Sequence, residues 1–194
     1  MSRLKAKALT FLELIIAMLL AAVILLAIHN ISFYTNFHVL TADRRAKTQN
    51  EAVFCLEHMS KELARAIGNE KINVGQIVDI TGDVNISAFI DAYPGDGQRG
   101  SADYWIKYSF NRGERNLTYC GNCGADKNCA VCGSSWEKIS DKVYDFNANP
   151  TDNFISLNIT ACYDPKEKKF LCGTPDNPTA NLTTRIKMPQ VSVN

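Results

Sequence analysis

Hydrophobic residues open the chain as one long run and return later in two shorter patterns. Between Phe11 and Ile28 the only residue that is not apolar is Glu13. The run is close to the roughly 17–25 residues that a helix needs to span a bilayer. We therefore predict a transmembrane helix over residues 9–30, preceded by a short basic leader over residues 1–8.

The second pattern has helical spacing. Apolar residues recur at intervals of three and four at Ala52, Leu56, Met59, Leu63, Ala66 and Ile67. This spacing predicts one apolar helix face, and Gly68-Asn69 predicts its end. No proline occurs before Pro94. We expect an amphipathic continuation over residues 31–69 and one helix from Leu9 to about Ile67, roughly 90 Å long at about 1.5 Å per residue.

The third pattern alternates and predicts strands in a globular domain over residues 70–194. It is clearest over residues 104–110, 155–161 and 182–188, and weaker over residues 76–80, 85–90, 117–120 and 142–147. A long helix followed by a run of strands indicates an α+β fold, in which the second half of the helix packs on a small antiparallel sheet.

Charge indicates the orientation in the membrane. Arg3, Lys5 and Lys7 precede the apolar run, and basic flanks stay on the cytoplasmic side, so the domain lies outside. Within the run, a charged residue costs about 2.5–3.5 kcal/mol at the bilayer centre and less near an interface. Glu13 is therefore expected to have a function, and a cation beside it would offset the cost.

The leader, the acid and the apolar run together resemble the cleavage and assembly signal of type IV pilins and type II secretion pseudopilins. Leu9-Thr-Phe-Leu-Glu13-Leu matches the family's first mature residues, except that Ala8 stands for the usual Gly and Leu9 for the usual Phe. The resemblance implies that prepilin peptidase cuts between Ala8 and Leu9 and that Leu9 is N-methylated. It also implies that Glu13 meets the new α-amino group of a neighbouring subunit during assembly.

The order of elements looks like the J-type minor pseudopilins and the PilW-like minor pilins. This implies a structural subunit, not an enzyme, that waits in the inner membrane and joins or primes a pilus or pseudopilus. Its partners would be other pilins, with an assembly platform and an ATPase acting indirectly. The alternatives are a membrane-anchored extracytoplasmic protein that binds a ligand or metal without polymerising, and a membrane-tethered redox enzyme.

Seven cysteines add a second feature. They are Cys55, Cys120, Cys123, Cys129, Cys132, Cys162 and Cys172. Two Cys-x-x-Cys pairs in the loop over residues 120–132 could form disulfides, hold zinc as four thiolates, or stay free. We favour disulfides because an exported domain meets an oxidising space, and because the spacer is much shorter than the roughly 15–20 residues of common zinc ribbons. Cys162 and Cys172 are expected to form a further disulfide.

Catalysis has little support. All three histidines, His29, His38 and His58, fall on the predicted helix, which excludes a Ser–His–Asp arrangement confined to the strand-rich domain. Thiol–disulfide catalysis needs a thioredoxin-like βαβ context, whereas the Cys-x-x-Cys pairs fall in a Gly-rich connection. Cys55 and His58 share a helix face and could form a pair, but a small buried thiol beside a surface histidine is the simpler interpretation.

Calcium and nucleic acid are two further classes of ligand. Asp91, Asp96 and Asp103 leave calcium binding open as a weak alternative to solvated turn acids. A net charge of +1 gives no bulk attraction to nucleic acid. A small set of basic residues could contact phosphates, although a solvated surface is the simpler interpretation and nucleic acid is not the expected partner. These residues are Lys166, Lys168, Lys169, Arg185 and Lys187.

Overall fold

The computed structural model describes residues 11–66, 77–79, 84–90, 103–126, 128–151, 154–169 and 171–187. The chain divides into two compact units, Met1–Ala42 and Asp43–Asn194. Within these described ranges one helix precedes eight strands: α1 (Phe11–Leu63), β1 (Ile77–Asp79), β2 (Val84–Ile90), β3 (Tyr104–Asn111), β4 (Asn116–Cys120), β5 (Glu137–Ser140), β6 (Val143–Thr151), β7 (Phe154–Cys162) and β8 (Thr179–Lys187). The predicted α+β class is confirmed.

The part of α1 in the first unit is an apolar helix whose side chains are all exposed from Phe11 to Leu40. Between Phe11 and Leu63 the sequence has neither glycine nor proline, the two residues that most destabilise a helix interior. Among the described residues, α1 is the one helix whose length and composition would let it cross a membrane.

In the second unit α1 is amphipathic. Its buried residues include four of the predicted stripe, together with Thr48 and Cys55, which the stripe did not contain. The four are Ala52, Leu56, Met59 and Leu63. The α-helix ends at Leu63, before the predicted Gly68-Asn69 stop, which lies outside the described residues. After Leu63 the turn tightens, because the amides of Arg65 and Ala66 bond three residues back instead of four. Ala66 then forms an isolated bridge with Ile90 of β2.

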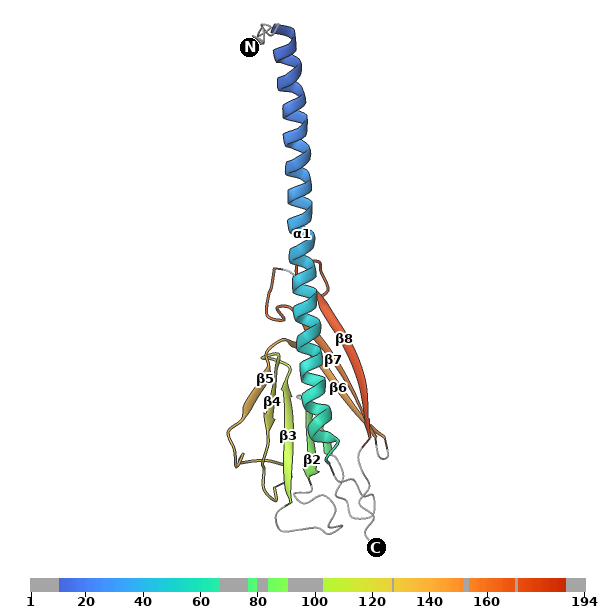
Figure 1. The fold of residues 1–194 in the computed structure, drawn as a ribbon. Coiled ribbons are helices and arrows are strands. Elements are labelled where there is room, and N and C mark those ends of the chain that lie inside the picture. Colours follow the sequence, from blue (N-terminus) through green and yellow to red (C-terminus); the bar gives the residue numbers. More distant parts are fainter. Residues whose placement is uncertain are drawn as a thin grey trace, which may run out of the picture. The chain divides into compact units, whose positions relative to one another are not determined.

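The strands form two antiparallel sheets, with orders β1-β2-β3-β4-β5 and β6-β7-β8. Figure 1 shows the later part of α1 running along both of them. The sequence predicts seven of the eight strands but not β5, in which Glu137 and Lys138 are exposed and only Ile139 and Ser140 are buried. With two consecutive exposed residues before two buried ones, β5 lacks the alternation that reveals a strand.

The core of the domain lies between α1 and the two sheets. The sheets meet through aromatic residues, since the rings of Phe110 in β3 and Phe146 in β6 contact edge to face with centroids 6.1 Å apart. Both rings are fully buried, as are Met59 of α1 and Tyr108 of β3. This core holds β3 and β4 in place, and the cysteine-rich loop follows β4.

Candidate functional site

The first candidate site is the apolar part of α1 in the first unit. Glu13 lies in the first turn of the helix, where a carboxylate interacts favourably with the positive end of the helix dipole. It is exposed, and large apolar side chains such as Leu12, Leu19 and Leu26 are 67%, 63% and 64% exposed. The predicted cleavage site, Ala8 and Leu9, lies outside the described residues.

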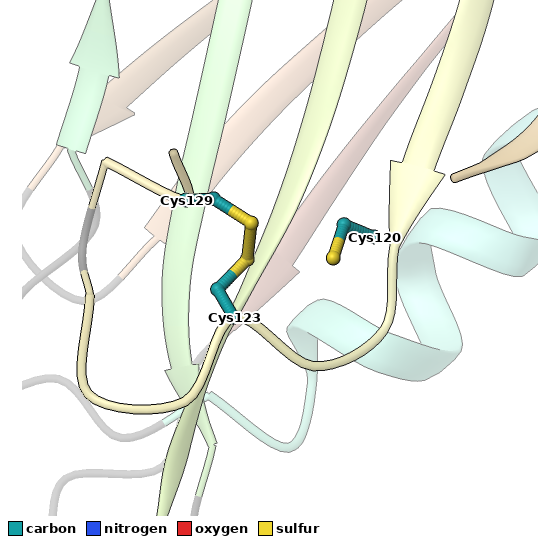
Figure 2. Close-up of side chains that lie close together, drawn as sticks. All are labelled: Cys120, Cys123 and Cys129. Carbon is teal, nitrogen blue, oxygen red and sulfur yellow. A yellow bond between two sulfur atoms is a disulfide. The ribbon is translucent and has the colours of Figure 1, made fainter. Parts of the chain in front are cut away.

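The second candidate site is the cysteine-rich loop that follows β4. Two disulfides close it, and they are nested: Cys120–Cys132 encloses Cys123–Cys129. Figure 2 shows Cys120, at the end of β4, close to the Cys123–Cys129 bridge. Four cysteines allow three pairings. Neither Cys-x-x-Cys pair bonds within itself in two of these pairings, and the structure has the nested one of the two.

Hydrogen bonds that involve no sulfur also shape this loop. The side-chain Oδ1 of Asn122 accepts a bond from the Gly124 amide at 2.8 Å, and the Asn122 carbonyl accepts one from Gly133 at 2.7 Å. The carboxylate of Asp126 accepts bonds from the amides of Ala130 (2.7 Å) and Asn128 (2.9 Å). These two amides lower the pKa of Asp126, that of Ala130 having the larger effect.

The loop is also fastened to the sheet. Trp105 of β3 donates its amide to the Gly124 carbonyl at 2.9 Å and accepts the Cys123 amide at 2.7 Å, which extends the strand pairing beyond β4. Trp105 packs against Phe89, and both belong to one apolar cluster with the buried Cys120, Cys123 and Cys129. Sequence reasoning missed these contacts of Trp105. It also missed the turns at Asn122 and Asp126, although Asn or Asp two residues before an amide is a known signal for such turns.

The third disulfide, Cys162–Cys172, closes the loop that begins at the end of β7. Asn177 holds this loop by a reciprocal pair of hydrogen bonds with Asp164, each 2.8 Å long. Asn177 is buried, with an exposed fraction of 2%. Its side-chain amide supplies the internal hydrogen-bond partners that the Asp164 backbone needs away from water.

Cys55 is the seventh cysteine and carries a free thiol. It is fully buried, and burial raises its pKa to about 12. The His58 ring does not pair with it in any described contact; instead His58 Nδ1 and the Tyr108 hydroxyl lie 2.9 Å apart. Cys55 therefore fits the interpretation of a small buried thiol in the core.

The remaining candidate residues do not gather into one site. Asp91 and Asp96 lie outside the described residues, while Asp103 is buried at 9% exposure. In the register of β7 with β8, Cys162 pairs with Thr179 and Phe154 pairs with Lys187. Lys187 is thus at the opposite end of β7 from the loop that carries Lys166, roughly 26 Å away at about 3.3 Å per residue. The predicted group of basic residues is therefore split between the two ends of a sheet.

Chemically, the described residues offer an exposed apolar helix with one acid near its start, and a compact cross-linked loop beside a β-sheet. No family model, no curated protein and no solved structure matches the chain in comparison.

Proposed function

We propose that this chain is a minor pilin or pseudopilin, a structural subunit that is cut by prepilin peptidase and then joins or primes an extracytoplasmic filament. The observation that carries the proposal is the character of α1. Its N-terminal part is exposed throughout the 30 residues from Phe11 to Leu40, and up to Ile28 its only residue that is not apolar is Glu13 in the first turn. The later part of the helix is amphipathic and packs on the strand-rich domain of the same chain.

Exposure on this scale needs a cover. Soluble proteins rarely leave contiguous apolar patches larger than a few hundred Å² in contact with water. Before assembly the lipid hydrocarbon covers the helix, and after assembly the equivalent helices of neighbouring subunits cover it. The two environments are similarly apolar, so transfer between them does not require the helix to refold.

Glu13 makes the transfer selective. Removing residues 1–8 would leave Leu9 with a positively charged α-amino group, four residues before the acid in the sequence. In a stack of parallel helices, the amine of one subunit can meet the Glu13 carboxylate of the next. The attraction between these groups grows as water is excluded, so it favours the packed filament over the single subunit in lipid.

The strand-rich domain would then provide the contacts that distinguish this subunit from others. Its surface carries exposed apolar side chains outside α1, including Val131 in the cysteine-rich loop (78% exposed) and Leu171 beside Cys172 (73% exposed). Val131 directly precedes Cys132 and Leu171 directly precedes Cys172, so a disulfide restricts the backbone beside each of them. Such restriction lowers the entropy lost when a partner binds.

The test replaces Glu13 in the native host and measures the chain in the membrane and in sheared filaments by quantitative immunoblotting. We expect Glu13→Ala and Glu13→Gln to insert normally but to fall at least about tenfold in the filament fraction, which corresponds to about 1.4 kcal/mol of assembly free energy. Glu13→Asp keeps the charge and is the matched control. Normal incorporation of Glu13→Ala would refute the proposal.

A second measurement separates this function from the alternative of a membrane-anchored binding protein. N-terminal sequencing of the chain from its own host should begin at Leu9. A chain that keeps Met1, in membranes and outside them, would favour the anchored protein instead.

A further inference from the structure

The first part of α1 is as long as a bilayer is thick. Its side chains are exposed from Phe11 to Leu40, which at about 1.5 Å per residue covers about 45 Å. A bilayer with both headgroup regions measures about 40–45 Å. Over residues 11–42 the only formally charged residue is Glu13, whereas residues 43–47 contain four. In a chain anchored by this helix, residues 43–47 therefore lie at the outer surface of the headgroups.

The loop between β7 and β8, residues 163–178, is fastened to this same stretch of α1 (Figure 1). Arg44 donates to the Asp176 carbonyl at 2.8 Å, and its guanidinium lies 3.2 Å from the Asp176 carboxylate. The same guanidinium lies over the Tyr163 ring, 5.5 Å from its centroid. Because Arg44 comes four residues after Leu40 in α1, the loop lies close to the outer headgroup surface as well.

Residues 43–47 and this loop together form a surface with an excess of positive charge, which we call the basic surface. Its sequence contains six cations and four acids, although the whole chain has a net charge of only +1. Two of the acids are in ion pairs, Asp43 with Lys47 at 2.8 Å and Asp176 with Arg44. The six cations are Arg44, Arg45, Lys47, Lys166, Lys168 and Lys169.

The other two acids order the backbone that carries the lysines. Asp164 Oδ1 accepts a hydrogen bond from the Lys166 amide at 3.1 Å, and Glu167 Oε1 accepts one from the Lys169 amide at 2.8 Å. The side chains of Lys166, Lys168 and Lys169 are all exposed. An ordered backbone with exposed lysines loses less entropy when it binds a charged surface.

An exposed apolar residue accompanies the lysines of the loop. Leu171 is 73% exposed, and the adjacent Cys162–Cys172 disulfide restricts its backbone. Binding to a membrane surface grows with the apolar area that enters the headgroup layer and with the attraction of basic residues to anionic lipids. The loop offers both of these contributions.

We propose that the basic surface binds the anionic headgroups of the bilayer that holds α1, while the subunit waits for assembly. The lysines attract the lipid phosphates, and Leu171 enters the headgroup layer. This contact holds the domain close to the bilayer until neighbouring subunits replace the lipid around α1. The proposal rests on the membrane insertion of α1, which is part of the proposed function, but not on cleavage of the leader or on polymerisation.

The experiment uses the full chain in nanodiscs, made either of phosphatidylcholine alone or of phosphatidylcholine mixed with phosphatidylglycerol. Leu171 is replaced with the photo-cross-linking residue benzoylphenylalanine, and lipid adducts are measured by mass spectrometry after illumination. We expect at least about threefold more lipid adducts in the anionic discs, because each basic residue near an anionic surface adds to the attraction. About 1 M salt, which shortens the Debye length to about 3 Å, should remove the difference.

The same replacement at Val131 is the matched control. Val131 is 78% exposed and directly precedes a disulfide-bonded cysteine, as Leu171 does. Its loop bonds to the start of β3, which pairs with the end of β2, where Ala66 forms its bridge just after α1. Ala66 follows Arg44 by 22 residues, which places this loop roughly 30 Å from the basic surface. We expect no lipid adducts at Val131 in either kind of disc.

Charge reversal tests the lysines directly. Changing Lys166→Glu, Lys168→Glu and Lys169→Glu together should reduce the adducts at Leu171 in anionic discs to their level in neutral discs. In the unmodified chain, acetylation of these lysines by an uncharged reagent should be at least about threefold slower in anionic discs. Lys61, which is exposed near the end of α1, should react equally fast in both.

Three results would overturn the proposal: equal adduct yields at Leu171 in neutral and anionic discs, equal yields at Leu171 and Val131, or adducts of Leu171 with a second copy of the chain in place of lipid. If the cross-linking variants fail to fold, equal acetylation rates of the loop lysines in the two kinds of disc would overturn it. None of these measurements depends on Glu13, so their outcome is separate from that of the filament assay.

Discussion

Replacing Met59 with alanine tests whether the second half of α1 is held by the two sheets. Met59 is fully buried in the core between the helix and the strands. The substitution removes Cγ, Sδ and Cε, which at about 0.8 kcal/mol for each CH₂-sized group gives about 2.4 kcal/mol. The cavity left behind adds to this, and the measured range for such changes is about 2–5 kcal/mol. We expect a loss of about 3 kcal/mol in the free energy of unfolding.

Val53→Ala is the matched control on the same helix. Val53 is 42% exposed and lies outside the buried stripe. Alanine is the stronger helix former, which offsets part of the small loss of contact. We expect the free energy of unfolding to change by less than about 0.5 kcal/mol, as is usual for surface substitutions.

Pulse proteolysis in urea measures both variants in the full chain, in a mild detergent. With a dependence of about 2 kcal/mol per molar urea, Met59→Ala should lower the unfolding midpoint by about 1.5 M. Val53→Ala should shift it by less than about 0.25 M. Equal midpoints for the two variants would refute the argument that this helix face is buried by the sheets.

Three other outcomes follow from the domain. Because burial raises the pKa of Cys55 to about 12, iodoacetamide at pH 8 should label this thiol only after unfolding, and fast labelling of the folded chain would contradict its burial. Changing both Cys162 and Cys172 to serine should cost about 2.7 kcal/mol in the same urea assay, from a sequence separation of 10, and an unchanged midpoint would contradict this. The bond from the Ala130 amide lowers the pKa of Asp126 from 3.8. The contribution of this carboxylate to folding stability is therefore present above that pH and is lost as the pH falls through the lower pKa of the folded state. Hydrogen-exchange protection of Ala130 should accordingly fall as the pH is lowered below 3.8, and unchanged protection through an acid titration would count against this role.

The sequence predicts those elements whose pattern repeats over many residues. The stripe that includes Ala52 and Met59 is confirmed as a buried helix face. The alternation in residues 104–110 is likewise confirmed, since Ile106, Tyr108 and Phe110 are all buried in β3. These patterns can be recognised in the sequence because a single periodicity decides which side of each element faces the core.

Contacts between elements far apart in the chain are harder to predict from the sequence. Trp105 interrupts the alternation of β3 because it is buried on the other face, under the cysteine-rich loop. β5 and β6 follow each other in sequence but belong to different sheets. The two sheets meet through Phe110 and Phe146, which are far apart in sequence. The disulfide pairing could not be deduced either, because spacing alone leaves three pairings open for the four cysteines of the loop.

The nested bridges have a consequence for how the chain matures. In a flexible chain the nearest cysteines meet most often, so Cys120–Cys123 should form before Cys123–Cys129, whose separation is 6. Chains that close the shorter ring first reach the mature pairing only by exchange of that bond, and we expect the yield to depend on a disulfide isomerase in the compartment where the domain folds.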